Sequence, residues 1–430
     1  MTTRGAGDAV APGEGAVITR KQWRWSVLAG MASYLDAGSI VALSAGLALF
    51  QTEFHLSSGA VGALAAIGPN ALGCAIGAFV GGRLGDKLGR KRIYKYDLLI
   101  YAAGILCIAL GVGPAMLFAG TFVVGLAVGA DVPTSLALVG EFSPAKARGR
   151  LLGFTQVAWN LGPVIVLVLA LILAPFGLLG IRIVFGHLCL VALVTWVLRQ
   201  GLAESARWRS ASERAGGVAH KMRALFTGAN LRAVAWTSAI YVFWNLAAGT
   251  NGIFTPYIIK TLHAGSQAAS VALSGAGFAI GIVATVALFM PFADRSHATR
   301  RLMWGAGGVM QVLAFVAYLV APFTVPVIIV NIVLFAVGGA LAGEAFYKTF
   351  SQELFPTMLR GTAQGFTFGV ARTVLGVWSF FVPILATAGI RPVAFLLAVF
   401  LLISAAVGFF LMPDTSGKTL EEIEAERAAA

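Results

Sequence analysis

The segment Glu141-Phe-Ser-Pro-Ala-Lys-Ala-Arg-Gly149 has a counterpart 212 residues later, Glu353-Leu-Phe-Pro-Thr-Met-Leu-Arg-Gly361. Both share the pattern E-x-x-P-x-x-x-R-G, and each follows a long apolar run. The longest polar loop of the chain, residues 199–232, lies between them. A pattern repeated at this interval in a chain of 430 residues indicates an internal duplication into two similar halves.

The apolar runs decide the class of protein. Hydrophobic residues make up 58% of the chain and charged residues 11%, which excludes a soluble globular protein and a disordered chain. A helical span needs about 20 apolar residues. Twelve apolar stretches can be counted, at residues 25–50, 60–82, 96–112, 116–141, 151–173, 183–198, 234–259, 267–290, 303–319, 325–352, 363–384 and 393–411. We therefore predict an all-α integral membrane protein with twelve transmembrane helices in two pseudo-symmetric six-helix bundles.

The distribution of Lys and Arg predicts the orientation. With both termini in the cytoplasm, 26 of the 31 cationic residues fall in cytoplasmic segments and three in outer loops. Cytoplasmic loops carry such an excess of cations. The basic cytoplasmic loops would face an anionic membrane surface, and they account for the net charge of +13. A nucleic-acid partner is therefore excluded. The predicted parts are a cytoplasmic tail (1–22), a first bundle (23–198), a cytoplasmic linker (199–232), a second bundle (233–411) and a second cytoplasmic tail (412–430).

Other classes of protein find little support in the sequence. The three cysteines fall inside apolar runs and show neither a disulfide framework nor metal-ligand spacing. The five histidines are scattered, and no Ser/His/Asp or Cys/His constellation is present, so an enzyme, a metal site and a cofactor are not expected. The polar N-terminal segment argues against a cleaved signal peptide, and a membrane sensor would carry a larger cytoplasmic domain.

Three further segments resemble sequence motifs of a known protein family. They are Gly82-Arg-Leu-Gly-Asp-Lys-Leu-Gly-Arg-Lys-Arg92, Ala203-Glu-Ser-Ala-Arg-Trp208 and Pro413-Asp-Thr-Ser-Gly-Lys-Thr-Leu-Glu-Glu-Ile-Glu424. Together with the paired E-x-x-P-x-x-x-R-G segments, they resemble the major facilitator superfamily, in particular its sugar porter family and related metabolite:proton symporters. The resemblance covers residues 20–425. It implies a monomeric carrier in the cell membrane, plasma or inner, that works by alternating access.

The charged residues of these motifs form a candidate cytoplasmic gate, as the resemblance implies. The candidates are Arg83, Asp86, Arg90, Glu141, Arg148, Glu204, Arg207, Asp294, Glu353 and Arg360. Arg–carboxylate pairs there would hold the halves together when the carrier opens outward. The alternative is solvated surface charges, each pair contributing about 0–1 kcal/mol. Because Met290 and His297 replace two motif glycines in the second half, we expect an asymmetric gate.

Five charged residues lie deep in apolar runs, where an ionisable side chain is costly and is by default a functional candidate. Ten residues from a span end correspond to about 15 Å, the bilayer centre. Asp36, Asp131, Glu344 and Arg372 meet this criterion, and Lys348 lies somewhat nearer the cytoplasm.

Two of these acids are candidate proton carriers. Asp36 is similar to the span 1 aspartate that carries the proton in proton-coupled sugar porters. The family's usual partner, an Arg in span 4, is replaced here by Thr121. Asp131 is an additional acid in the same span 4. Either Asp36 or Asp131 could carry the proton, or the two could titrate as a pair.

The remaining candidates concern the solute. Gln156 and Asn251 match sugar-binding positions of the family, Asn160 lies at similar depth, and Asn245 stands where the family has a Gln of its span 7 pair. Arg372 could bind a substrate carboxylate through two hydrogen bonds, or it could be the partner of an intramembrane acid. Glu344 and Lys348 could contact substrate or neutralise each other at i,i+4 spacing. Two hypotheses follow: a proton-coupled carrier of a small sugar or polyol, and a carrier of an organic anion such as a sugar acid or aromatic acid.

Overall fold

The computed structural model describes residues 17–214, 222–261, 267–386 and 388–429. These residues form helices and connecting segments, and no β-strand occurs among them. Within the described residues, ten helical segments are long and apolar enough to cross a membrane. Two more helices, α5 and α10, pack among them and complete the predicted twelve. The predicted all-α membrane fold is confirmed.

The first half contains six crossings. They are α1 (Arg20–Glu53), α2 with α3 (Ser58–Ile67 and Leu72–Leu88), α5 (Asp97–Ala109), α6 (Pro114–Phe142), α7 (Arg148–Ile172) and α8 (Gly177–Arg199). The first helix begins with a capping box, in which the side chains of Thr19 and Gln22 satisfy each other's backbone N–H groups. Helix α1 packs against α6, α7 and α8, and α5 packs on α6 and α8.

The second half repeats this organisation. Its helices are α10 (Gly228–Thr261), α11 with α12 (Gln267–Ala284 and Met290–Phe292), α13 (His297–Val320), α14 with α15 (Val325–Leu341 and Glu344–Glu353), α16 (Arg360–Ala386) and α17 (Ile390–Phe410). A π-helical segment, Thr285–Phe289, joins α11 to α12. Hydrophobic side chains such as Val320 and Phe410 are exposed on the outside, as expected for helices that face lipid.

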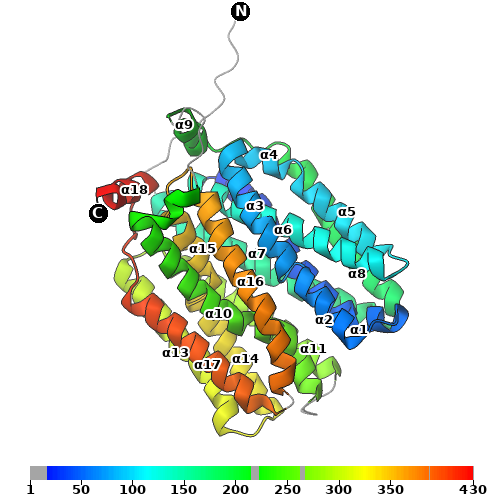
Figure 1. The fold of residues 1–430 in the computed structure, drawn as a ribbon. Coiled ribbons are helices and arrows are strands. Elements are labelled where there is room, and N and C mark those ends of the chain that lie inside the picture. Colours follow the sequence, from blue (N-terminus) through cyan, green and yellow to red (C-terminus); the bar gives the residue numbers. More distant parts are fainter. Residues whose placement is uncertain (1–16, 215–221, 262–266, 387, 430) are drawn as a thin grey trace, which may run out of the picture.

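Short helices gather at one end of the molecule. They are α4 (Arg90–Tyr94), α9 (Ala206–Arg214) and α18 (Leu420–Ala429). Figure 1 shows α9 and α18 at the same end of the long helices. We call this end the linker end, because α9 belongs to the loop between the two halves.

The two halves meet mainly through α3 with α16 and α7 with α11. These helices are the second and fifth crossings of each half, so the interface follows the internal repeat. Glycines allow the close approach of α3 and α16. A Cβ at Gly82 would collide with the carbonyl of Gly361, and one at Gly365 would collide with the carbonyl of Ala78. Small residues at a membrane-helix interface allow this kind of backbone contact.

The predicted tenth span is divided at Ala342 and Gly343, between α14 and α15. The Gln311 side chain satisfies carbonyl groups at the break, since its Nε2 donates to Ala342 O at 2.7 Å and to Gly338 O at 3.3 Å. Irregular backbone inside a membrane is tolerated only where the protein satisfies it in this way. The break makes Glu344 the first residue of α15, where the helix dipole favours a carboxylate.

Candidate functional site

A layer of buried polar contacts joins the two halves at the linker end. Asp86, near the end of α3, accepts hydrogen bonds from Gly361 N at 3.0 Å, from Thr362 N at 2.6 Å and from Thr362 Oγ1 at 2.7 Å. Both N–H groups belong to the first turn of α16, where a negative charge is stabilised by the helix dipole. Asp86 of the first half therefore caps a helix of the second half.

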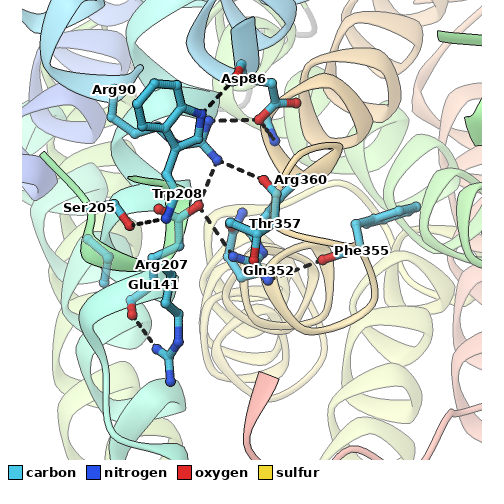
Figure 2. Close-up of polar contacts among 12 residues, drawn as sticks. Asp86, Arg90, Glu141, Ser205, Arg207, Trp208, Gln352, Phe355, Thr357 and Arg360 are labelled. Atoms are coloured by element: carbon cyan, nitrogen blue, oxygen red, sulfur yellow. Dashed lines mark hydrogen bonds and ion pairs between the residues drawn. The ribbon is translucent and has the colours of Figure 1, made fainter. Parts of the chain in front are cut away.

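Arg90 extends this layer between two carboxylates (Figure 2). Its Nη1 lies 2.8 Å from Asp86 Oδ1, and its Nη2 lies 2.6 Å from Glu141 Oε1. Glu141 Oε1 also lies 3.3 Å from Arg360 Nη1 of the second half. Burial lowers the pKa of the Arg90 guanidinium, but the Glu141 and Asp86 carboxylates raise that pKa by more. Arg90 therefore stays charged and holds both acids.

The second half carries a matching cluster around Glu353. Arg300 Nη1 lies 2.8 Å from Glu353 Oε2, and Arg148 Nη1 of the first half lies 3.1 Å from Glu353 Oε1. Thr415, in the segment before α18, donates to Glu353 Oε2 at 2.6 Å. Each cluster thus has one Glu bound by an Arg of its own half and an Arg of the other half.

Asp294 repeats the capping role of Asp86. It follows α12, and it accepts hydrogen bonds from Gly149 N at 2.7 Å and Arg150 N at 2.9 Å in the first turn of α7. Burial raises the pKa of the Asp294 carboxyl against the opposing charge of Arg300. The sequence predicts an asymmetric gate, whereas the contacts of the two clusters are closely matched. Although two motif glycines are missing in the second half, Asp294 makes the same kind of contact as Asp86.

The linker between the halves is tied to the first cluster. Glu204 accepts hydrogen bonds from Arg90 N and Lys91 N, both at 3.1 Å. Trp208 of α9 donates from its indole to the carbonyl of Asp86 at 2.8 Å (Figure 2). Arg83, also predicted for the gate, is exposed and stands outside these contacts.

Arg207 connects α9 to the C-terminal helix. Its Nε lies 2.7 Å from Glu421 Oε1 of α18, and its Nη1 donates to the carbonyl of Glu141. Partial burial raises the pKa of the Glu421 carboxyl, but the hydrogen bond and charge of Arg207 lower it by more, so the net pKa is below its usual range. Together these contacts close the linker end.

Two adjoining cavities lie between the halves beyond this closed layer. The main cavity lies between α7, α10, α11 and α14 and has about 810 Å³ of empty space, including the part open to solvent; the inner cavity has about 470 Å³ on the same measure. They share the lining residues Trp159, Trp244, Ala248, Gly252 and Phe278. The predicted residues Gln156, Asn160 and Asn251 line the main cavity, and Asn245, Glu344 and Arg372 line the inner cavity.

Arg372, which lines the inner cavity, forms an ion pair with Asp36. Arg372 Nη2 of α16 lies 3.2 Å from Asp36 Oδ2 of α1, and both residues are almost completely buried. Trp159 Nε1 donates to the same carboxylate oxygen at 3.2 Å. Arg372 Nη1 donates to Asn70 Oδ1 at 2.8 Å. The guanidinium is therefore bound on two sides by groups of the first half.

A second charged pair is formed by Glu344, which lines the inner cavity, and Lys348. Lys348 Nζ is 3.6 Å from Glu344 Oε1 and donates to Gln156 Oε1 of α7 at 2.8 Å. Tyr241 OH donates to Glu344 Oε1 at 3.4 Å, and its ring stacks on Tyr347 with centroids 3.7 Å apart. The four charges around the cavity thus form two neutral pairs.

The structure places Asp131 away from this site. Both of its carboxylate oxygens accept from Arg199 Nη1, at 3.0 and 2.9 Å, and Ser135 donates to Oδ1 at 2.5 Å. Asp97 Oδ2 lies 3.7 Å from the same nitrogen. Among the described residues, Asp131 lines neither cavity, and it is not brought together with Asp36.

Sequence reasoning missed several partners. Trp159 and Asn70 are uncharged, so depth in the membrane did not single them out. Arg199 and Arg300 were counted only as cations at the cytoplasmic ends of spans. Their complete burial shows that they belong to the structural charge clusters.

A membrane protein with two six-helix halves, one end closed by ion pairs and a cavity between the halves has the architecture of the alternating-access transporters. The chain belongs to the Major Facilitator Superfamily, whose family model matches residues 26–383.

Similar proteins are transporters. The chain is 37% identical over 410 residues to the minor myo-inositol transporter IolF of Bacillus subtilis (strain 168), with 93% of each chain covered. It is 25% identical over 391 residues to the glucose transporter GlcP of Staphylococcus epidermidis, with 83% of this chain and 86% of that protein covered.

Among solved structures, the proton:xylose symporter XylE bound to 6-bromo-6-deoxy-D-glucose matches with a TM-score of 0.82 at 19% identity, and the match covers 94% of this chain and 98% of that chain. The inward-open conformation of XylE from E. coli matches with a TM-score of 0.68 at 20% identity, covering 93% and 98%. These matches confirm the fold.

Proposed function

We propose that the protein is a proton-coupled symporter of a small neutral solute with several hydroxyl groups, of the sugar or polyol type. The solute would bind in the main cavity, and Asp36 would carry the coupling proton. Gln156, Asn160 and Asn251 supply amide groups to the main cavity, and Asn245 supplies one to the inner cavity. Amide groups both donate and accept hydrogen bonds, as hydroxyl groups require.

The observation that carries this proposal is the charge balance of the cavity. Asp36 is paired with Arg372, and Glu344 with Lys348, so the four charges sum to zero. An anionic solute would have to displace an acid from one of the two cations. A neutral solute needs only hydrogen bonds and apolar contact, which the amides and the indoles of Trp159 and Trp244 offer.

Asp36 supports proton coupling through its surroundings. Its carboxylate is buried, and Oδ1 has no hydrogen-bond partner among the described groups. A buried carboxylate can bind and release a proton when its counter-charge moves. The similarity to IolF, a myo-inositol transporter, supports the proposal of a polyol substrate. The fold match to a proton:xylose symporter supports the proposal of proton coupling.

An organic anion remains the alternative substrate. It requires that Arg372 or Lys348 leave its acid and bind a solute carboxylate. Both cations are held by two partners each, Arg372 by Asp36 and Asn70, and Lys348 by Glu344 and Gln156. These contacts favour the neutral solute.

We further propose that the protein acts as a monomer in the cell membrane with the linker end in the cytoplasm. The 26-to-3 distribution of cations supports this orientation. Residues 1–22, 199–232 and 412–430 would then be the cytoplasmic tails and linker, and the closed linker end would make this an outward-facing conformation.

Uptake by proteoliposomes tests the proposed function. Purified protein is reconstituted and offered labelled myo-inositol, glucose, xylose and a matching sugar acid, with and without an inward proton gradient. We expect gradient-dependent accumulation of a neutral solute. Accumulation of the acid alone would overturn the proposal in favour of the anion carrier.

A further inference from the structure

The ion pair of Asp36 joins the two halves of the molecule. Asp36 lies on α1 of the first half and Arg372 on α16 of the second. The position where the family resemblance expects an Arg of the first half is Thr121, which is buried and carries no charge. The counter-charge of the candidate proton carrier has therefore been supplied from the opposite half.

Arg372 has a second acid within its own half. Glu344 and Arg372 both line the inner cavity, and both belong to the second half. Glu344 Oε1 lies 3.6 Å from Lys348 Nζ, a longer distance than the 3.2 Å between Arg372 Nη2 and Asp36 Oδ2. The Phe368 ring, 4.8 Å from the guanidinium carbon, faces Arg372 from one turn earlier on α16.

The ionisable groups around Asp36 come from several helices. Arg372, Glu344 and Lys348 face it from the second half, and Trp159 donates to it from α7. Cys74 of α3, Tyr34 of α1, Tyr101 of α5 and Tyr241 of α10 complete this set of neighbours. Only Asp36 and Glu344 are acids, and only Arg372 and Lys348 are cations.

Binding one proton changes the charge balance of these two acids and two cations. With Asp36 ionised, two acids face two cations. When Asp36 is protonated, Arg372 keeps its charge and loses its partner, because a guanidinium does not release its proton in proteins. An unpaired cation deep in a membrane protein is costly, so Arg372 must find another acid.

We propose that Arg372 exchanges its counter-charge during the transport cycle. It pairs with Asp36 across the interface when Asp36 is ionised, and with Glu344 of its own half, which it then shares with Lys348, when Asp36 holds the proton. The exchange removes an ionic link between the halves and so couples proton binding to their separation at the linker end. This inference rests on the proposed role of Asp36 as proton carrier. It adds that Arg372 links the protonation of Asp36 to the movement of the halves.

A conformational measurement tests the exchange without reference to any substrate. Spin labels are placed at Lys91 and Ala298, two exposed positions at the linker end of opposite halves, after replacement of Cys74, Cys107 and Cys189. The distribution of label-to-label distances is recorded in lipid nanodiscs at about pH 8 and about pH 5, a range in which carboxyl groups with perturbed pKa values titrate.

We expect the wild type to gain a longer-distance population at low pH. Arg372→Gln should lose this pH response and resemble wild type at low pH throughout, because a buried carboxylate without a counter-charge takes up a proton instead of staying ionised. Arg372→Lys keeps the charge and should retain a pH response. Arg391→Gln removes an exposed cation on α17 and should behave as wild type.

The variants separate the proposed proton site at Asp36 from the proposed exchange of counter-charge by Arg372. If Asp36→Asn retains the full pH response, the proposed proton site is wrong. If Asp36→Asn abolishes the response and Arg372→Gln leaves it unchanged, the proton site stands and the exchange is wrong. A low-pH response that survives in Glu344→Gln would also contradict the exchange, since Arg372 would then lack its second acid. Gel filtration of each variant confirms that it is folded.

Discussion

Arg372 Nη2 lies 3.2 Å from Asp36 Oδ2, although 336 residues separate the two in the chain and they belong to opposite halves. Arg372 lines the inner cavity, which adjoins the proposed solute site. The carboxylate that we propose to bind the coupling proton is therefore also a contact between the two halves. This relationship explains how a proton could change both the charge of the cavity and the contact between halves.

Gln156 connects the solute site to the charged pairs. It lines the main cavity and accepts from Lys348 Nζ at 2.8 Å. Gln156→Leu should raise the KM for the solute about fivefold, since a hydrogen bond contributes about 1 kcal/mol and 1.4 kcal/mol corresponds to a factor of ten. Uptake kinetics in proteoliposomes measure this effect. The matched control is Gln200→Leu, an exposed site at the end of α8, and an equal rise in KM there would contradict the assignment.

Asp131 is expected to serve stability and not coupling. It is bound by Arg199 and Ser135 within the first half. Removing one partner of a buried ion pair typically costs about 3–5 kcal/mol, so Asp131→Asn should lower the melting temperature strongly. The ratio of internal to external solute at steady state should stay as in the wild type. If Asp131→Asn is stable but fails to accumulate solute, Asp131 carries the proton.

The capping acids at the linker end should have equivalent effects. Asp86→Asn and Asp294→Asn each remove a carboxylate that binds the first turn of a helix in the other half. Both variants should increase the longer-distance population of the label pair at Lys91 and Ala298. A change in Asp86→Asn alone would support the asymmetric gate that the sequence predicts. Arg83→Gln, at an exposed site, is the control.

The tail contact gives a prediction about pH. Arg207 lowers the pKa of Glu421 below its usual range, so the stability from this pair is present above that range and is lost only as pH falls through the lowered value. The contact between α9 and α18 should therefore be constant between about pH 5 and about pH 8. Glu421→Gln should leave the pH response of the label pair unchanged. A lost response would assign the pH sensitivity to the tail.

Much of the fold follows from the sequence for physical reasons. The apolar runs predict the positions of the helices, and the repeated E-x-x-P-x-x-x-R-G segments indicate that the two halves have similar structures. The break before Glu344 was not predicted, because the run stays apolar through it. Only the structure reveals the side chain of Gln311 that satisfies the carbonyl groups there.

The sequence predicts single candidate residues and a possible Glu344–Lys348 pair, and it leaves open which acid is the partner of Arg372. Depth in the membrane identifies Asp36 and Arg372 as costly charges. It does not give the rotation of α1 and α16 about their axes, which decides whether the two side chains meet. Asp131 passed the same test of depth and yet pairs with Arg199 elsewhere, so depth alone does not distinguish a cavity residue from a buried structural one.

The most direct test of the account compares accumulation with exchange in Asp36→Asn. Proteoliposomes containing wild type or variant are given the labelled neutral solute, first with an inward proton gradient and then with unlabelled solute inside and no gradient. A permanently neutral residue resembles the protonated state, so the variant should exchange solute and fail to accumulate it. Accumulation by Asp36→Asn at the wild-type level would contradict the account.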